Sequence, residues 1–412
     1  MIREPRPREI TAVDLDDIHE IDWSAVSHAY GPATDVPELL TSLARGENLK
    51  KVCWELWGNL FHQGTTYQAS HVAVPFLWRI LREGAPMLKV RLFLLTYLRG
   101  LARGYPEFPE RPDPELWWTW IEAFEAEKSR GSTKKTRGAS TSPSASVDER
   151  LYWSARSYFA VEAGLDAAIP LAESSDAPCA LHAVALLSDF PRKRALVVPP
   201  LAKIASATLS PVRGAATLGL ALLGEDVMPL STLLGDDDRA TRLYVAAALV
   251  VSGADVPTRA VDVLMSPLEE LADVECPFGE TLAGTVGAAS SRLPKSFHAR
   301  AVEALSLQHR EAKAFSRLSL TTRMLGLAFP QGVPASVTEL DDMQRLALET
   351  IVEHGGWTLG SGQWVNYTEA LRGFGLPSTK RTLQAWLRGE PDGVGRGETT
   401  ATRKKRTKKP PA

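Results

Sequence analysis

Cysteines, long apolar runs and catalytic signature motifs are scarce in this sequence. Its 412 residues include only three cysteines, Cys53, Cys179 and Cys276. They are odd in number and far apart, so we expect buried free thiols rather than a disulfide framework or a zinc site. No run of about 18 apolar residues predicts a membrane span. The charged first residues lack the apolar core of a secretory signal. These absences favour a protein of the reducing cytoplasm.

Motifs of the common enzyme classes are also missing. The chain has no phosphate-binding loop, no dinucleotide fingerprint after a strand, no zinc-protease motif and no nucleophile elbow. This lowers the expectation of an enzyme. We therefore predict no catalytic residue, no cofactor and no metal ion.

Charge is distributed unevenly along the chain. The net charge is −2, but the segment Arg403–Lys409 near the C-terminal end holds six basic residues and no acid. Without these six, 41 basic side chains stand against 49 acidic ones. An acidic body is a poor surface for nucleic acid, whose phosphates need Lys and Arg. The tail alone is a candidate nucleic-acid or polyanion arm, through Arg403, Lys404, Lys405, Arg406, Lys408 and Lys409.

A repeat of about 30 residues is the clearest pattern that is present. Pro-Leu pairs recur at Pro170, Pro200 and Pro229, 30 and 29 residues apart, each after an Ala- and Leu-rich run. Ala and Leu favour helix, and their spacing fits a 3.6-residue period. Each unit reads as a first helix, a short turn, and a second helix with the proline in its first turn, where a missing N–H costs nothing. Stacking such pairs buries the apolar faces that one pair leaves open.

Residues 150–265 resemble short bacterial HEAT-type repeats on this period and composition. The resemblance implies an all-α fold, an α-solenoid (superhelix) of HEAT-like helical-hairpin repeats. A longer version of the pattern, with Val-Pro-x-Leu at Val36 and Val74, makes Trp23–Leu81 similar to uncharacterised bacterial HEAT-repeat proteins. HEAT proteins resembling deoxyhypusine hydroxylase hold two irons with repeated His-Glu pairs. That order occurs here only once, at His19, so we reject this chemistry.

Composition divides the chain into six segments. They are a lead-in at 1–19, longer HEAT-like repeats at 20–126, a disordered Ser- and Lys-rich loop at 127–149, short HEAT-like repeats at 150–265, a helical region with a cap at 266–389, and a disordered basic tail at 390–412. In the fifth segment we expect helices at 296–328, at 341–354 and at Lys380–Arg388.

Polar residues crowd the stretch NLFHQGTTYQASH at 59–71. Its two histidines suggest a polar pocket, where imidazole binds a metal ion or transfers protons. The spacing of nine residues is not that of two ligands on one helix. The favoured interpretation is a corner between two helices, with Gly64 in the turn, His62 or Gln63 on the last carbonyls of the first helix, and Thr65 or Thr66 capping the second.

Tryptophan is concentrated in the first part of the chain, with eight of eleven before residue 160. We weighed a core of large side chains, an aromatic binding surface and a base-reading site. The candidate binding residues are Trp54, Trp57, His62, Gln63, Tyr67, His71, Trp117, Trp118 and Trp120. At "GDDDRATR" we expect a turn between repeats, in which an Asp caps the next helix rather than binding calcium.

The function that these features favour is a protein-binding scaffold with its partner on the concave face. The acidic body favours a basic partner, so an inhibitor of the immunity type, directed at a basic toxin or nuclease, is a specific hypothesis. One alternative is a nucleic-acid-associated protein resembling HEAT-like alkyl-purine DNA glycosylases, with Trp117, Trp118, Trp120, Glu122 and the tail. A second is a metal-dependent enzyme centred on His62 and His71. The sequence leaves the oligomeric state open.

Overall fold

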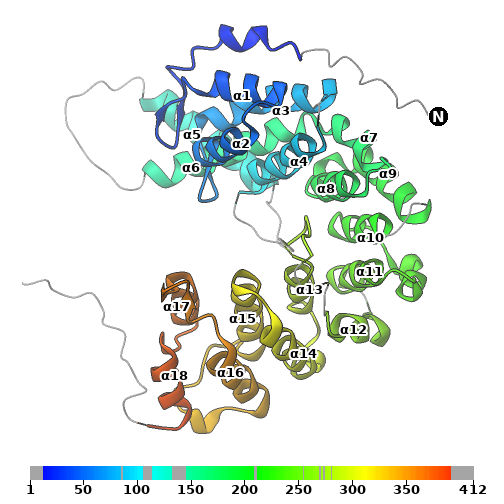
Figure 1. Cartoon of the computed structure of the whole chain (residues 1–412), viewed down its shortest axis with the longest axis vertical. Helices are drawn as coiled ribbons and strands as arrows, with labels where there is room; N and C mark the ends of the chain where they lie inside the picture. Colours follow the sequence, from blue (N-terminus) through cyan, green and yellow to red (C-terminus); the bar gives the residue numbers. More distant parts are fainter. Residues whose placement is uncertain are drawn as a thin grey trace, which may run out of the picture. The chain divides into compact units, whose positions relative to one another are not determined.

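The computed structural model describes residues 13–84, 87–104, 114–131, 145–207, 211–253, 255–268, 271, 274–279 and 281–390. The predicted all-α class is confirmed, because helices dominate the described residues (Figure 1). The chain forms two compact units. Unit 1 comprises residues 1–266 with 270–293, and unit 2 comprises 267–269 with 294–412. The predicted longer and shorter repeats therefore belong to one unit.

The α-helices of unit 1 run from α1 to α13. They are α1 (Val36–Arg45), α2 (Leu49–Leu60), α3 (Gln68–Gly84), α4 (Leu88–Arg103), α5 (Pro114–Gly131), α6 (Ala145–Glu162), α7 (Ile169–Ala172), α8 (Ala177–Leu187), α9 (Arg194–Ala207), α10 (Val212–Leu222), α11 (Arg239–Val251), α12 (Thr258–Met265) and α13 (Leu282–Ser290). Short 3₁₀ helices are η1 (Asp16–Glu20), η2 (Leu165–Ala168), η3 (Pro191–Lys193) and η4 (Met228–Gly235).

Helices in unit 1 pack in two layers. One row runs through α4, α8, α10, α11 and α13, in which each helix packs on the next (Figure 1). The second layer packs on this row: α7 on α8, α9 on α10, and both η4 and α12 on α11. Ahead of the row, α6 packs on α3, α4 and α5, and α1 packs on α2. The Ala- and Leu-rich runs thus form the helices of the row.

The repeat prolines do not all occupy the predicted position. Pro170 is the second residue of α7 and Pro229 is the second residue of η4, as expected for a proline in a first turn. Pro200 is an exception, because it lies inside α9 together with Pro199, and Pro75 likewise lies inside α3. In α9 the helix begins earlier, at Arg194, directly after η3. The prediction failed there because the helix-favouring residues Arg194, Ala195 and Leu196 begin the helix before the prolines.

Three β-hairpins of two-residue strands interrupt the helices. They are β1 (Ser27–His28) with β2 (Gly31–Pro32), β3 (Phe61–His62) with β4 (Thr65–Thr66), and β5 (Thr358–Leu359) with β6 (Gly362–Gln363). A separate single bridge joins Glu275 to Thr281. The predicted loop at 127–149 is also corrected, since α5 runs to Gly131 and α6 begins at Ala145. Residues 132–144 and the tail from 391 lie outside the described residues.

A buried ion-pair cluster ties α4 to the segment that follows α8 and to the segment that precedes α13. Arg99 Nε and Arg103 Nη1, both from α4, donate to the two carboxylate oxygens of Asp189 at 2.8 and 2.5 Å. The Asp189 side chain is fully buried. Arg99 also donates from Nη1 to the carbonyl oxygen of Pro277 and lies over the ring of Phe278. These contacts fix the segment before α13 against α4.

Unit 2 is a smaller helical unit. Its elements are η6 (Lys295–Phe297), α14 (His298–Glu311), α15 (Ala314–Ala328), η7 (Val337–Glu339), α16 (Asp342–His354), α17 (Val365–Gly373) and α18 (Lys380–Leu387), with the β5–β6 hairpin between α16 and α17. The helices expected at 341–354 and near the C-terminal end are confirmed, while the segment at 296–328 is two helices. No helix among the described residues is long and apolar enough to cross a membrane.

Candidate functional site

The 59–71 stretch forms a hairpin instead of the predicted simple corner. Gln63 and Gly64 occupy the turn between β3 and β4, both with positive φ (50° and 76°), as a tight two-residue hairpin requires. The predicted caps are wrong. Ser70 Oγ donates to the Leu60 carbonyl at the end of α2 and accepts from the N–H of Tyr67. Ser70 therefore makes the hydrogen bonds that we expected from His62, Gln63, Thr65 and Thr66.

A second hairpin, β1–β2, is fastened to the end of α2 by a chain of hydrogen bonds. His28 Nε2 lies 3.0 Å from Asp35 Oδ1, and Asp35 Oδ2 accepts from Asn59 Nδ2 at 2.6 Å. His28 Nδ1 accepts from the backbone N–H of Tyr30 at 3.0 Å. Both ring nitrogens of His28 are thus engaged in holding the hairpin, which fixes the backbone from which Tyr30 projects.

Tyr30, Trp54 and His62 form an exposed aromatic group, here called the α2 aromatic face. Tyr30 Oη lies 3.1 Å from His62 Nδ1, and the two rings meet edge to face with centroids 5.5 Å apart. The Tyr30 ring lies over Gly58, one helical turn after Trp54, so both rings belong to the same side of α2. Tyr30 is 69% exposed and Trp54 is 79% exposed.

The two histidines of the predicted pocket have different partners. His71 stacks on Trp153 of α6, with centroids 5.3 Å apart and planes inclined by 12°, whereas His62 contacts Tyr30. Burial, helped by nearby Arg156, lowers the pKa of His71 to about 4. Burial also raises the pKa of Tyr67. No group of three His, Cys, Asp or Glu side chains that could hold a metal ion occurs in the part of the chain that the structure describes. The metal-enzyme alternative therefore gains no support.

The remaining tryptophan candidates divide between core and surface. Trp57 is half-buried and packs on Phe61 and Tyr97. Trp117 is buried against Tyr158, while Trp118 is 46% exposed and donates to Glu122 at 2.9 Å. The Trp120 side chain and the basic tail lie outside the described residues. A buried Trp117 leaves no room for a base to stack on it, so the predicted base-reading cluster is not assembled by the described side chains.

Tyr30 is the member of the aromatic face that our sequence reasoning missed. Its signal was present in the sequence HAYGPATD, where a glycine follows the tyrosine and an aspartate lies seven residues after the histidine. Gly31 has φ 127°, which permits the turn of β1–β2. The capping prediction at "GDDDRATR" is confirmed, because Asp238 accepts from the N–H of Thr241 at the start of α11.

Comparisons with known proteins identify no relative: no protein-family model, no curated protein and no solved structure matches the chain. The function must therefore be argued from the residues themselves.

Proposed function

We propose that this chain is a HEAT-like protein-binding scaffold and that its protein partner docks on the α2 aromatic face. The observation that carries the proposal is the exposure of Trp54, at 79%. Trp23, Trp78 and Trp117 of the same unit are each no more than 6% exposed. An indole left in water forgoes the large gain from burying its apolar surface. A binding partner that covers it recovers this gain.

Tyr30 is held ready for a partner before binding. The His28–Asp35–Asn59 chain fixes its backbone, and the hydrogen bond with His62 fixes its ring. A side chain that is already ordered loses less conformational entropy on binding, so more of the contact energy appears as affinity. Trp and Tyr are also the residues most often found at the energetic centre of protein interfaces.

The nature of the partner follows from charge. The acidic body favours a basic protein and speeds its encounter with this chain. This keeps the immunity-type inhibitor as a specific form of the proposal. In this form of the proposal the basic partner contacts the α2 aromatic face rather than the concave face as a whole.

The test is capture of a partner from native lysate by the full chain, with Trp54→Ala and Tyr30→Ala as variants. Leu196→Ala in α9 is the matched control, because Leu196 is an exposed apolar residue of the same unit, 38% exposed. We expect a discrete protein whose affinity falls about 30-fold with Trp54→Ala, the size of a hot-spot residue, and is unchanged with Leu196→Ala.

Two results would overturn the proposal. One is a partner held equally well by Trp54→Ala and by the parent chain. The other is recovery of nucleic acid, lost on nuclease treatment or on removal of residues 391–412, which would favour the nucleic-acid alternative.

A further inference from the structure

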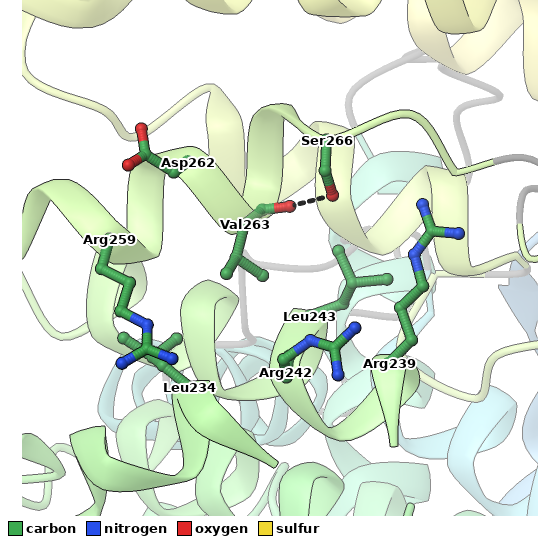
Figure 2. A pocket seen from close by; sticks show the side chains of 8 residues that line it. All are labelled: Leu234, Arg239, Arg242, Leu243, Arg259, Asp262, Val263 and Ser266. Carbon is green, nitrogen blue, oxygen red and sulfur yellow. Dashed lines mark hydrogen bonds between the residues drawn. The ribbon is translucent and has the colours of Figure 1, made fainter. Parts of the chain in front are cut away.

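A pocket lined by three arginines lies between η4, α11 and α12, within unit 1. Its volume is about 410 Å³, in the range of small-ligand sites. Figure 2 shows the side chains that line it: Leu234, Arg239, Arg242, Leu243, Arg259, Asp262, Val263 and Ser266. Sequence analysis did not predict this site, because Arg242 and Arg259 lie on two different helices.

The charge of the lining is strongly positive. Three guanidinium groups share the pocket with one carboxylate, that of Asp262, which points away from them in Figure 2. Two of the three acids of the GDDD turn, Asp236 and Asp238, have partners outside the pocket lining. Asp236 pairs with Arg213, and Asp238 accepts from the backbone and the hydroxyl of Thr241. Their charges are therefore directed to other partners.

The guanidinium groups of Arg242 and Arg259 differ in how many of their N–H groups are already hydrogen-bonded. Arg242 Nη1 donates to the carbonyl oxygens of Asp236 and Asp237 at 2.5 and 3.0 Å, which holds its side chain in place. Nε and Nη2 remain to bind a ligand. Arg259 makes no hydrogen bond or ion pair with the described part of the chain, so its whole guanidinium group is available.

The position of Arg239 and Arg242 adds to the positive potential. Both lie in the first turns of α11, where the helix dipole already disfavours a positive charge. A bound anion would offset this repulsion. Leu234, Leu243 and Val263 form the apolar part of the wall, and Ser266 adds a hydroxyl group.

We propose that this pocket binds a small phosphate monoester, with the phosphate between Arg242 and Arg259 and the ester carbon group against the three apolar residues. Two guanidinium groups match a dianion, and their planar forks fit phosphate oxygens in pairs. A carboxylate carries half that charge. The site is separate from the α2 aromatic face and stands independently of the proposed scaffold function.

The experiment is calorimetric titration of the full chain with phenyl phosphate at pH 7.5, with benzoate as the monoanionic control. We expect phenyl phosphate to bind and benzoate to bind at least about tenfold more weakly. Arg259→Gln should weaken phenyl phosphate about tenfold or more, the value of one charge-assisted contact. Arg292→Gln, an exposed arginine outside the pocket lining, should leave it unchanged. Affinity should also fall below about pH 6, where the ester loses its second charge.

Three results would overturn the proposal: no heat of binding at millimolar phenyl phosphate, equal binding of benzoate, or unchanged affinity in Arg259→Gln. Circular dichroism of Arg259→Gln checks that α12 is intact. Because Arg259 makes no described hydrogen bond, we expect an unchanged spectrum.

Discussion

The later helices of the row, α8, α10, α11 and α13, and the N-terminal helices α1–α6 pack by different means. In the row, small residues let helix backbones approach, as where a Cβ on Gly214 would lie 2.7 Å from Thr241 Cα. In the N-terminal helices, aromatic rings pack on one another, as where Trp57 contacts Phe61 and Tyr97. The comparison shows which of the two regions leaves large side chains exposed to a binding partner. Small residues are buried throughout the faces they form, whereas large residues leave Trp54 and Tyr30 outside.

Of the substitutions considered, one in the ion-pair cluster of Arg99, Arg103 and Asp189 should cause the largest loss of stability. Asp189→Asn keeps the shape of the side chain but removes the negative charge with which the buried Arg99 and Arg103 both pair. We expect unit 1 to lose about 3–5 kcal/mol of unfolding free energy, as for a broken buried ion pair. Urea unfolding measures it.

The control for this substitution is Asp166→Asn. Asp166 pairs with Arg82 across two exposed side chains, at 3.2 Å. Such a pair contributes about 0–1 kcal/mol. Equal losses of unfolding free energy in the two variants would show that the ion pairs of Asp189 do not stabilise unit 1 more than an exposed pair does.

Close packing in the row predicts the next effect. Gly214→Ala places a methyl group 2.7 Å from Thr241 Cα and 2.9 Å from Thr241 O. These are backbone atoms, so a change of side-chain rotamer cannot relieve the overlap. We expect a loss of about 1–3 kcal/mol, as for other overpacked sites, measured by thermal or urea unfolding.

Gly58→Ala in α2 is the matched substitution in the aromatic region. Its added methyl group meets only the Tyr30 ring, at 4.0 Å. Alanine is the better helix former, so we expect a gain of about 0.5–1 kcal/mol. A gain in both variants would remove the contrast between the two regions.

A pH-dependent effect belongs to the aromatic region. The pKa of His71 is about 4 in the folded chain and 6.5 for an unperturbed imidazole. Between these values the unfolded chain binds the proton and the folded chain does not, so stability falls as pH drops from about 6.5 to 4. From pH 7 to 5 the loss is about 2 kcal/mol.

His71→Phe removes this proton site and keeps a ring on Trp153. In this variant, the free energy of opening that hydrogen exchange reports for α3 and α6 should no longer fall by about 2 kcal/mol from pH 7 to 5. Exchange in unit 2 should keep its own pH dependence, because burial also lowers the pKa of His309 there, to about 3. An unchanged pH dependence in α3 would contradict the assignment.

Local patterns predicted the helices of the row, and distant contacts explain most of what was missed. The Ala- and Leu-rich runs of α8, α10 and α11 carry their own helical preference, which needs no partner to be read. The hairpin β1–β2 depends on Asp35 binding both His28 and Asn59, the latter 24 residues away. Arg242 and Arg259 line one pocket only because α12 packs on α11. Side-chain exposure, which singles out Trp54 from Trp57, also depends on tertiary packing.

The bond from Arg99 to the carbonyl of Pro277 has a consequence for folding. It joins residues 178 apart in the sequence, whereas contacts within a helix row are mostly between neighbours. A row of neighbours alone can fold from any point and fray from its ends. Closing so long a loop costs chain entropy that only an assembled row can offset. We therefore expect the tie to form late, and to make α4 and the segment before α13 open together rather than one repeat at a time.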